Sequence, residues 1–222
     1  MSVYAKASQF QQRPVAKTGA FFDVSKFEIV SEAPKSLKNM KLVRCWDKAG
    51  TKDGGDYSSG TLMGKMKDGR YIVLDVVRGQ WDALKRERII RATALSDGSR
   101  VVIEVEQEGG SGGKESAENT IRNLAGFKAY KRRWTGSKES RAEPYSVQVN
   151  AGNMLVCDRA WTEEFIKEHK YFPKGDFDDQ VDSSSGAFNR LAGRPTLKGT
   201  WGGSHNRVQK RPKKPKKVAR VF

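Results

Sequence analysis

A hairpin signal near the middle of the chain constrains the fold most strongly. The segment "TLMGKMKDGRYIVLDVVRG" at residues 61–79 consists of two apolar runs that "KDGR" separates. An Asp-Gly pair between two such runs is typical of an antiparallel β-hairpin, because glycine adopts the backbone angles that a tight turn needs. The chain is therefore expected to build a sheet that contains an antiparallel pair of strands.

Apolar runs and amphipathic segments on either side of this hairpin predict an α/β domain. Short strand-like runs occupy residues 41–46, 101–108, 127–134 and 153–157. Helical patterns occupy residues 81–96, 138–150 with an interruption near Pro144, 160–172 and 178–193, and "GGSGGK" is expected to be a loop leading into a helix at "ESAENTIRNLAGF". Antiparallel strands followed by βα crossovers indicate a mixed sheet with helices on its faces.

The composition divides the chain into three parts. Residues 1–40 are polar and weakly periodic, so we expect an N-terminal extension or linker. Residues 41–193 carry the strand and helix patterns and are expected to form the folded domain. Residues 194–222 contain mainly Gly, Pro and Lys with almost no apolar period, which predicts a flexible basic tail.

The charge of the chain favours a polyanionic partner. The formal net charge is +16, no acidic residue follows Asp182, and residues 205–222 contain eight Lys and Arg residues. Because each neutralised phosphate releases counterions, a basic body with a basic tail favours nucleic acid. A tail that serves only solubility or localisation is the alternative.

The cysteines and the termini favour an intracellular protein. Cys45 and Cys157 lie in apolar runs, so we expect buried free thiols in a reducing compartment. The N-terminus "MSVYAKASQF" lacks the apolar stretch of a secretory signal. No apolar run approaches the roughly 18 residues that cross a bilayer.

Carboxylates are placed where the predicted elements could bring them together. They are Asp47 at the end of the first strand, Glu104 and Glu106 on a later strand, and Asp178, Asp179 and Asp182 at the start of the last helix. If the first strand and the 101–108 strand are neighbours, these side chains converge and repel one another unless cations lie between them. Oxygen ligands without a His or Cys cluster favour Mg²⁺ or Mn²⁺. Two such ions would support phosphodiester hydrolysis.

Each of these signals also has a structural explanation. An Asp at a strand end is commonly a turn residue, "DD" before an apolar-periodic run is commonly a helix cap, and alternating Glu residues commonly mark the solvent face of a strand. Their order along the chain is what favours a nuclease over these separate explanations.

The chain places an Asp at a strand end, then a hairpin, then Glu on a strand and finally an Asp cluster on the last helix. In this order, the motifs resemble the C-terminal nuclease domain of the large terminase subunit of tailed bacteriophages. The resemblance covers about residues 41–193 and is carried by "WDKAGTKDGGDYSSG", "VEQEGGSGGK", "KESRAEPYSVQVNAGNMLV" and "FPKGDFDDQVDSSSGAFNRL". It implies an RNase H-like mixed sheet of the five-stranded type flanked by helices. The implied activity is a Mg²⁺- or Mn²⁺-dependent endodeoxyribonuclease that cuts concatemeric viral DNA during packaging in the host cytoplasm.

The resemblance also assigns roles to residues of this chain. Asp47, Glu106 and Asp179 would be catalytic and, together with Asp182, would hold two divalent metal ions. Asp56 and Asp178 would be supporting carboxylates, and Glu106 is preferred to Glu104 because the Glu-Gln pair of the family aligns there. This chain has Phe177 where many members have His. Phosphate contacts are expected from Lys114, Lys131, Arg132, Arg133, Lys213 and Lys214.

Large terminases also carry an ATPase, and the resemblance implies an ATPase part, a small terminase subunit and a portal as partners besides double-stranded DNA. "GGSGGKES" fails the spacing of a phosphate-binding loop, so we expect no ATPase in this chain. Two other functions stay open: a non-catalytic nucleic-acid-binding or assembly protein with an RNase H-like core, and an RNase H-like junction resolvase.

Overall fold

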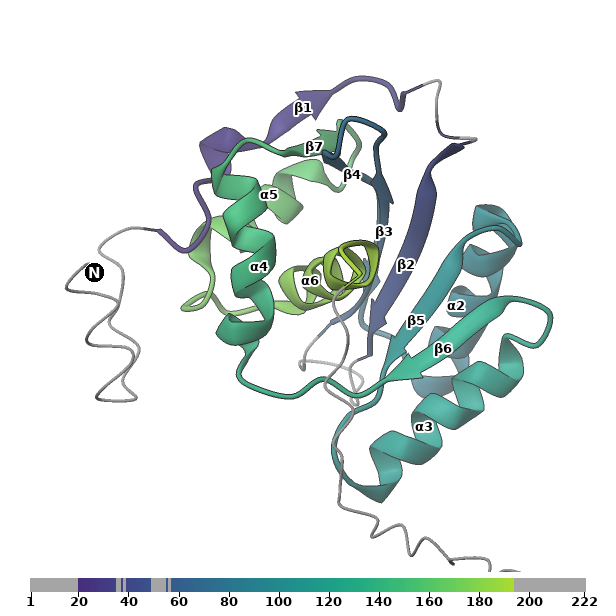
Figure 1. The fold of residues 1–222 in the computed structure, drawn as a ribbon. Coiled ribbons are helices and arrows are strands. Elements are labelled where there is room, and N and C mark those ends of the chain that lie inside the picture. The colour runs from purple at the N-terminus through teal and green to yellow at the C-terminus, as the bar shows by residue number, and fades with distance from the viewer. Residues whose placement is uncertain (1–19, 35–36, 38, 49–54, 56, 194–222) are drawn as a thin grey trace, which may run out of the picture.

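The computed structural model describes residues 20–34, 37, 39–48, 55 and 57–193. Its strands form one sheet in the order β1-β7-β4-β3-β2-β5-β6 (Figure 1). The strands are β1 (Glu28–Val30), β2 (Lys41–Asp47), β3 (Ser58–Lys65), β4 (Tyr71–Gly79), β5 (Val102–Glu106), β6 (Lys128–Arg132) and β7 (Met154–Cys157). The α-helices are α2 (Ala83–Asp97), α3 (Gly110–Asn123), α4 (Lys138–Asn150), α5 (Thr162–Tyr171) and α6 (Asp179–Leu191).

The sheet is mixed, as predicted. β2, β3 and β4 pair antiparallel, which confirms the hairpin, and β5 then lies parallel to β2 on its other side. β6 pairs parallel with β5, and β7 pairs parallel with β4. The described sheet has seven strands, two more than the five-stranded type that the resemblance implies, because β7 and β1 continue it beyond β4.

Helices cover both faces of the sheet, with α4, α5 and α6 on one side and α2 and α3 on the other (Figure 1). The larger core lies on the α6 side and contains Met63, Tyr145, Phe165 and Phe188. A second cluster lies between the sheet and the pair α2 and α3, where Trp46 packs with Ile90 and Leu124.

The small residues of α6 explain why this helix lies so close to the sheet. Its Ser183 hydroxyl lies 3.0 Å from the hydroxyl of Ser59 and 2.8 Å from that of Thr61, both on β3. A Cβ atom at Gly186 would lie only 2.4 Å from Sγ of Cys45. The sequence "SSSG" therefore lets α6 approach the sheet, and almost every residue of the helix is buried.

Part of the segment expected to be an N-terminal extension packs on this core. Phe22 and Phe27 are buried and contact the His169 ring at centroid distances of 5.0 and 5.5 Å. A 3₁₀ helix, η1 (Val24–Lys26), leads into β1, which pairs parallel with β7 at the edge of the sheet. Residues 1–19 and the expected tail, 194–222, lie outside the described residues.

Two helices differ from the predictions. α3 begins within the glycine-rich segment that was expected to be a loop, and a Cβ atom at Gly113 would lie 2.6 Å from the carbonyl oxygen of Glu108. Glycine thus permits a close approach at the start of this helix. α4 continues through Pro144, because its buried residues Ala142 and Tyr145 pack against the core and offset the missing backbone hydrogen bond.

Cys45 and Cys157 are both free and buried, as predicted. None of the helices in the described ranges has the length and the apolar character to cross a membrane.

Candidate active site

The end of the sheet at Asp47 brings carboxylates from two strands together. Trp46 of β2 lies opposite Val105 of β5 in the parallel pair, so the next residues, Asp47 and Glu106, are also neighbours. On the other side of β2, Asp47 pairs with Ser59 of β3. The two acidic side chains that were predicted to be adjacent therefore lie on neighbouring strands.

The first turn of α6 adds carboxylates to the same place. Asp179 and Asp182 are both buried in this turn, and Asp178 is the N-cap residue. Burial raises the pKa of Asp47 well above its usual range, and the negative charges of Glu106, Asp182 and Asp179 raise it further. Burial also raises the pKa values of Glu106 and Asp182. Asp47, Glu106, Asp179 and Asp182 form one crowded group, which we call the carboxylate cluster.

Two cations of α4 bridge the carboxylate cluster. Arg141 donates from Nη1 to Oε1 of Glu106 at 2.7 Å and from Nη2 to Oδ1 of Asp182 at 3.1 Å. Lys138 lies 2.5 Å from Oδ1 of Asp178 and 3.3 Å from Oδ2 of Asp182. The sequence analysis missed both residues, because nothing in "SKESRAEP" indicates that they face an acidic group 40 residues further along the chain.

The chemistry of the carboxylate cluster fits a divalent metal. Its donors are carboxylate oxygens without Cys or His, which is the set that Mg²⁺ and Mn²⁺ prefer. Within the described part of the chain, no three Asp, Glu, His or Cys side chains are arranged to hold an ion as they stand. Instead, Arg141 and Lys138 place positive charge beside the carboxylates of Glu106 and Asp182. The crowding that raises the pKa of Asp47 is what bound cations would relieve.

Glu168 of α5 holds the first turn of α6 in place. Its carboxylate accepts hydrogen bonds from the backbone N–H of Gln180 at 2.5 Å and of Val181 at 3.3 Å, and from the Gln180 side chain at 2.7 Å. The N-cap residue Asp178 makes no side-chain capping bond, so Glu168 supplies the cap from another helix. Arg78 of β4 lies 3.4 Å from the same carboxylate. No local sequence pattern indicates the contact between Glu168 and the first turn of α6.

Lys48 anchors the strand end that carries Asp47. Its buried ammonium donates to the carbonyl oxygen of Ser116 at 3.1 Å, to the Ser116 hydroxyl at 2.8 Å and to the Thr120 hydroxyl at 2.9 Å. Burial lowers the pKa of Lys48 to about 8. Through these bonds α3 fixes the position of Lys48, directly after the end of β2. Residues 49–54, which follow it, lie outside the described ranges.

Glu104, the alternative to Glu106, is placed differently. Arg132 of β6 and Arg190 of α6 lie 2.7 and 3.2 Å from its Oε1 atom. The side chain is only 1% exposed, and burial raises its pKa despite the two cations. Glu104 thus belongs to an internal ion cluster.

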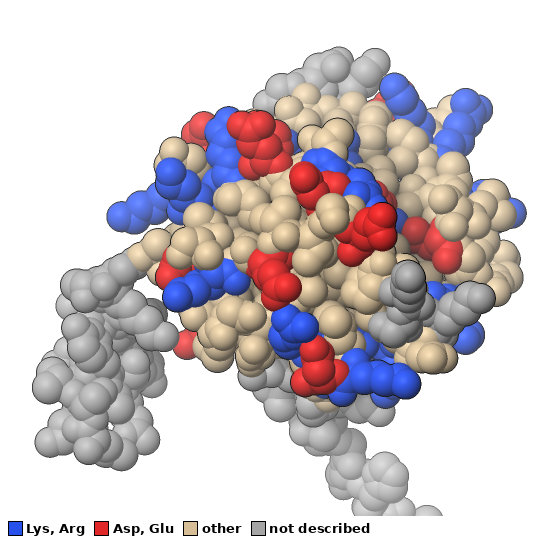
Figure 2. Space-filling model, turned by 90° about the horizontal axis from the view of Figure 1, so that it is seen from above, with Lys and Arg blue, Asp and Glu red and all other residues tan. Residues whose placement is uncertain are grey.

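The predicted phosphate-binding residues fall into three groups. Lys114 and Arg133 are exposed. Lys131 is exposed but lies 2.5 Å from Glu118, and Arg132 is largely taken up by Glu104. Lys213, Lys214 and the supporting carboxylate Asp56 lie outside the described residues. On the face shown in Figure 2, Lys and Arg are interspersed with Asp and Glu and do not form a single basic patch.

Several solved structures share this fold at low sequence identity. The nuclease of the large terminase from the thermophilic phage G20c, with bound zinc, matches with a TM-score of 0.59 and 14% identity over 78% of this chain and 99% of that one. The large terminase nuclease domain of Thermus phage P74-26 matches with a TM-score of 0.57 and 11% identity over 80% and 97%. The terminase nuclease domain of human cytomegalovirus matches with a TM-score of 0.57 and 10% identity over 77% and 95%.

No curated protein matches the sequence. The family model of the terminase RNaseH-like domain matches residues 44–191, which include the end of β2 with Asp47, β5 with Glu106 and the whole of α6. The mixed sheet, the position of α6 and this match agree. The chain belongs to the family of terminase RNase H-like domains.

Proposed function

We propose that this chain is a metal-dependent endodeoxyribonuclease that cuts concatemeric viral DNA during genome packaging. Membership of the terminase RNase H-like family supports a nuclease role in packaging. The observation that carries the proposal is the carboxylate cluster, which β2, β5 and α6 build at one end of the sheet. Burying four carboxylates together costs stability. A metal-dependent reaction would explain why they lie together, because it needs several carboxylate ligands at one place.

In this proposal Asp47, Glu106, Asp179 and Asp182 hold two divalent ions, Mg²⁺ or Mn²⁺. The G20c nuclease, which shares the fold, has been crystallised with zinc, with magnesium and with cobalt bound. Bound cations would activate a water molecule as hydroxide and neutralise charge on the leaving oxygen of a phosphodiester. Until cations bind, Arg141 and Lys138 neutralise part of the carboxylate charge.

Contacts to DNA would come from exposed cations around this domain. Lys114, Arg133, Lys213 and Lys214 are candidates, and such contacts to phosphates hold DNA without selecting a sequence. The ATPase part, the small terminase subunit and the portal would then determine where the nuclease cuts, in the cytoplasm of the infected host. We further propose a division into an N-terminal extension over 1–40, part of which packs on the core and adds β1 to the sheet, a nuclease domain over 41–193 and a basic tail over 194–222.

Cleavage of supercoiled plasmid with Mn²⁺ tests the proposal. The wild-type protein should convert the plasmid to nicked and linear forms, and EDTA should prevent this. Asp47→Ala should abolish cleavage, because it removes a carboxylate from the centre of the cluster. An intact plasmid under all conditions, or an Asp47→Ala variant that cuts as fast as the wild type, would contradict the nuclease assignment.

A non-catalytic DNA-binding role is the second candidate. The ion pairs of Arg141 and Lys138 favour it, because they neutralise part of the cluster without any metal. The same assay decides between the two: a protein that retains plasmid in a gel-shift experiment but never cuts it would support this second role.

A further inference from the structure

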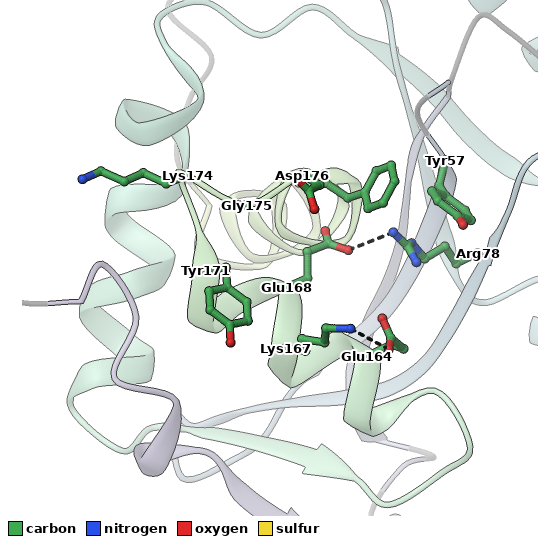
Figure 3. Close-up of a pocket in the computed structure, with 10 residues that line it drawn as sticks. Tyr57, Arg78, Glu164, Lys167, Glu168, Tyr171, Lys174, Gly175 and Asp176 are labelled. Carbon is green, nitrogen blue, oxygen red and sulfur yellow. Dashed lines mark hydrogen bonds and ion pairs between the residues drawn. The ribbon is translucent and has the colours of Figure 1, made fainter. Parts of the chain in front are cut away.

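A pocket lies beside the first turn of α6, on the side away from Glu106. Its volume is about 400 Å³, and its lining includes Tyr57, Arg78, Glu164, Glu168, Tyr171 and Phe177 (Figure 3). Ser59 of β3 pairs with Asp47 of β2 on one side and with Arg78 of β4 on the other. Since neighbouring strands lie roughly 4.8 Å apart, the backbone at Arg78 is about 10 Å from that at Asp47.

Three aromatic rings, those of Tyr57, Tyr171 and Phe177, form part of the pocket wall. The Arg78 guanidinium lies 3.7 Å from the centre of the Tyr57 ring, and Tyr57 meets Phe177 edge to face at 5.0 Å. Tyr171 stands on the other side of the space from Tyr57 and Arg78 (Figure 3). Phe177 is 39% exposed and Tyr171 is 54% exposed, so both rings are accessible. Aromatic rings and guanidinium planes are the surfaces on which nucleobases stack.

The charges of the pocket are balanced. Arg78 lies 3.4 Å from Glu168, and Lys167 lies 3.4 Å from Glu164. The whole lining carries three cations, Arg78, Lys167 and Lys174, and three carboxylates, Glu164, Glu168 and Asp176. A phosphate is attracted by surplus positive charge, which this pocket lacks, whereas a neutral planar heterocycle needs only the aromatic walls and a few polar groups.

We infer that this pocket receives an unpaired nucleobase of the DNA strand next to the phosphate at the carboxylate cluster. This inference rests on the proposed function. A base stacked within a duplex cannot enter such a recess, but a base that has left the stack can. The base would lie against Glu168, directly behind the turn that carries Asp179 and Asp182.

Binding in EDTA tests the pocket separately from cleavage. Two duplexes are compared, one with a single extrahelical adenine and one with an abasic residue at that position. The wild type should bind the first on the order of tenfold more tightly, because the unpaired adenine can stack on the aromatic rings of the pocket. Phe177→Ala and Tyr171→Ala should bind both duplexes about equally. Tyr130→Ala is the matched control, because Tyr130 is equally exposed but lies on β6.

Two results would overturn the inference. One is equal binding of both duplexes by the wild type, which would show that the pocket does not receive a nucleobase. The other is a Phe177→Ala variant that keeps the full preference for the extrahelical base. The plasmid assay distinguishes this failure from that of the proposed function. Cleavage without a base preference overturns only the pocket assignment, and a base preference without cleavage overturns only the nuclease.

Discussion

Glu104 and Glu106 lie two residues apart on β5 and point to the same face of the sheet, yet their surroundings differ. Glu104 is 1% exposed and has two arginines, Arg132 and Arg190, at one carboxylate oxygen. Glu106 is 16% exposed and shares its arginine, Arg141, with Asp182, while Asp47 lies on the neighbouring strand. Glu104 has two cations at one of its oxygens, whereas Glu106 belongs to a cluster in which the carboxylates outnumber the cations.

This difference separates a structural carboxylate from a candidate catalytic one. The two arginines of Glu104 offset part of the cost of burying its charge, so this carboxylate has little to gain from a metal ion. In the carboxylate cluster, burial and then the neighbouring negative charges raise the pKa of Asp47, so its charged form is destabilised until cations bind. The number of cations per carboxylate therefore distinguishes the two glutamates better than burial does.

The largest expected effect is on cleavage by Glu106→Gln. Removal of residues in the outer shell of a metal site commonly costs roughly 10–100-fold in metal affinity or activity, so loss of a ligand should slow plasmid cleavage by more than about 100-fold. Glu104→Gln, assayed where circular dichroism shows it to be folded, should cut within a few-fold of the wild type. If Glu104→Gln loses cleavage and Glu106→Gln keeps it, the two roles are reversed.

The next effect is on the stability of Glu104→Gln. Loss of the buried charge leaves Arg132 and Arg190 without their anion, and breaking a buried pair costs about 3 kcal/mol. Urea denaturation in EDTA measures this loss. Glu118→Gln is the matched control, because its exposed pair with Lys131 should contribute less than about 1 kcal/mol. Equal midpoints for the two variants would show that Glu104 is not structural.

A third glutamate, Glu168, extends the comparison to a carboxylate that accepts hydrogen bonds from uncharged N–H groups as well as facing a cation. Glu168→Ala should lower the free energy of unfolding by about 2 kcal/mol, because the buried N–H groups of Gln180 and Val181 lose their acceptor. It should also reduce the increase in melting temperature that Mn²⁺ gives, since Asp179 and Asp182 lie in the same turn. Glu164→Ala, an exposed neighbour on α5, should change neither quantity.

The smallest effect concerns Asp47→Asn and pH. Because its pKa is raised in the folded state, Asp47 keeps its proton at pH values where the unfolded chain, with a pKa of roughly 3.9, has lost it. Its contribution to stability is therefore present at low pH and declines as the pH rises. In EDTA, Asp47→Asn should be more stable than the wild type at pH 8, and the difference should shrink toward pH 4. Urea denaturation across this range measures it, and a destabilised variant at pH 8 would contradict the crowding.

The parts of the site that sequence could predict are those set by local pattern. β2 and β5 were recognisable as apolar runs, and their pairing brings Asp47 beside Glu106. The start of α6 was recognisable from its acidic residues before a helical period. Arg141 and Glu168 were not recognisable, because their contacts to Asp182 and Gln180 depend on how separate helices pack. Three-residue β1 carries no period that distinguishes it from a linker.

The central position of α6 has a consequence for how the protein is made. α6 is the last described element of the chain, yet it packs on β2, whose residues are synthesised more than 130 positions earlier. Contacts between residues so far apart in sequence slow folding, and they cannot form until the later segment is available. Asp179 and Asp182 reach Asp47 only in that same final step. A nascent or truncated chain without α6 therefore lacks both its main core and two of the four carboxylates of the cluster, so the proposed metal site can form only after α6 has been made.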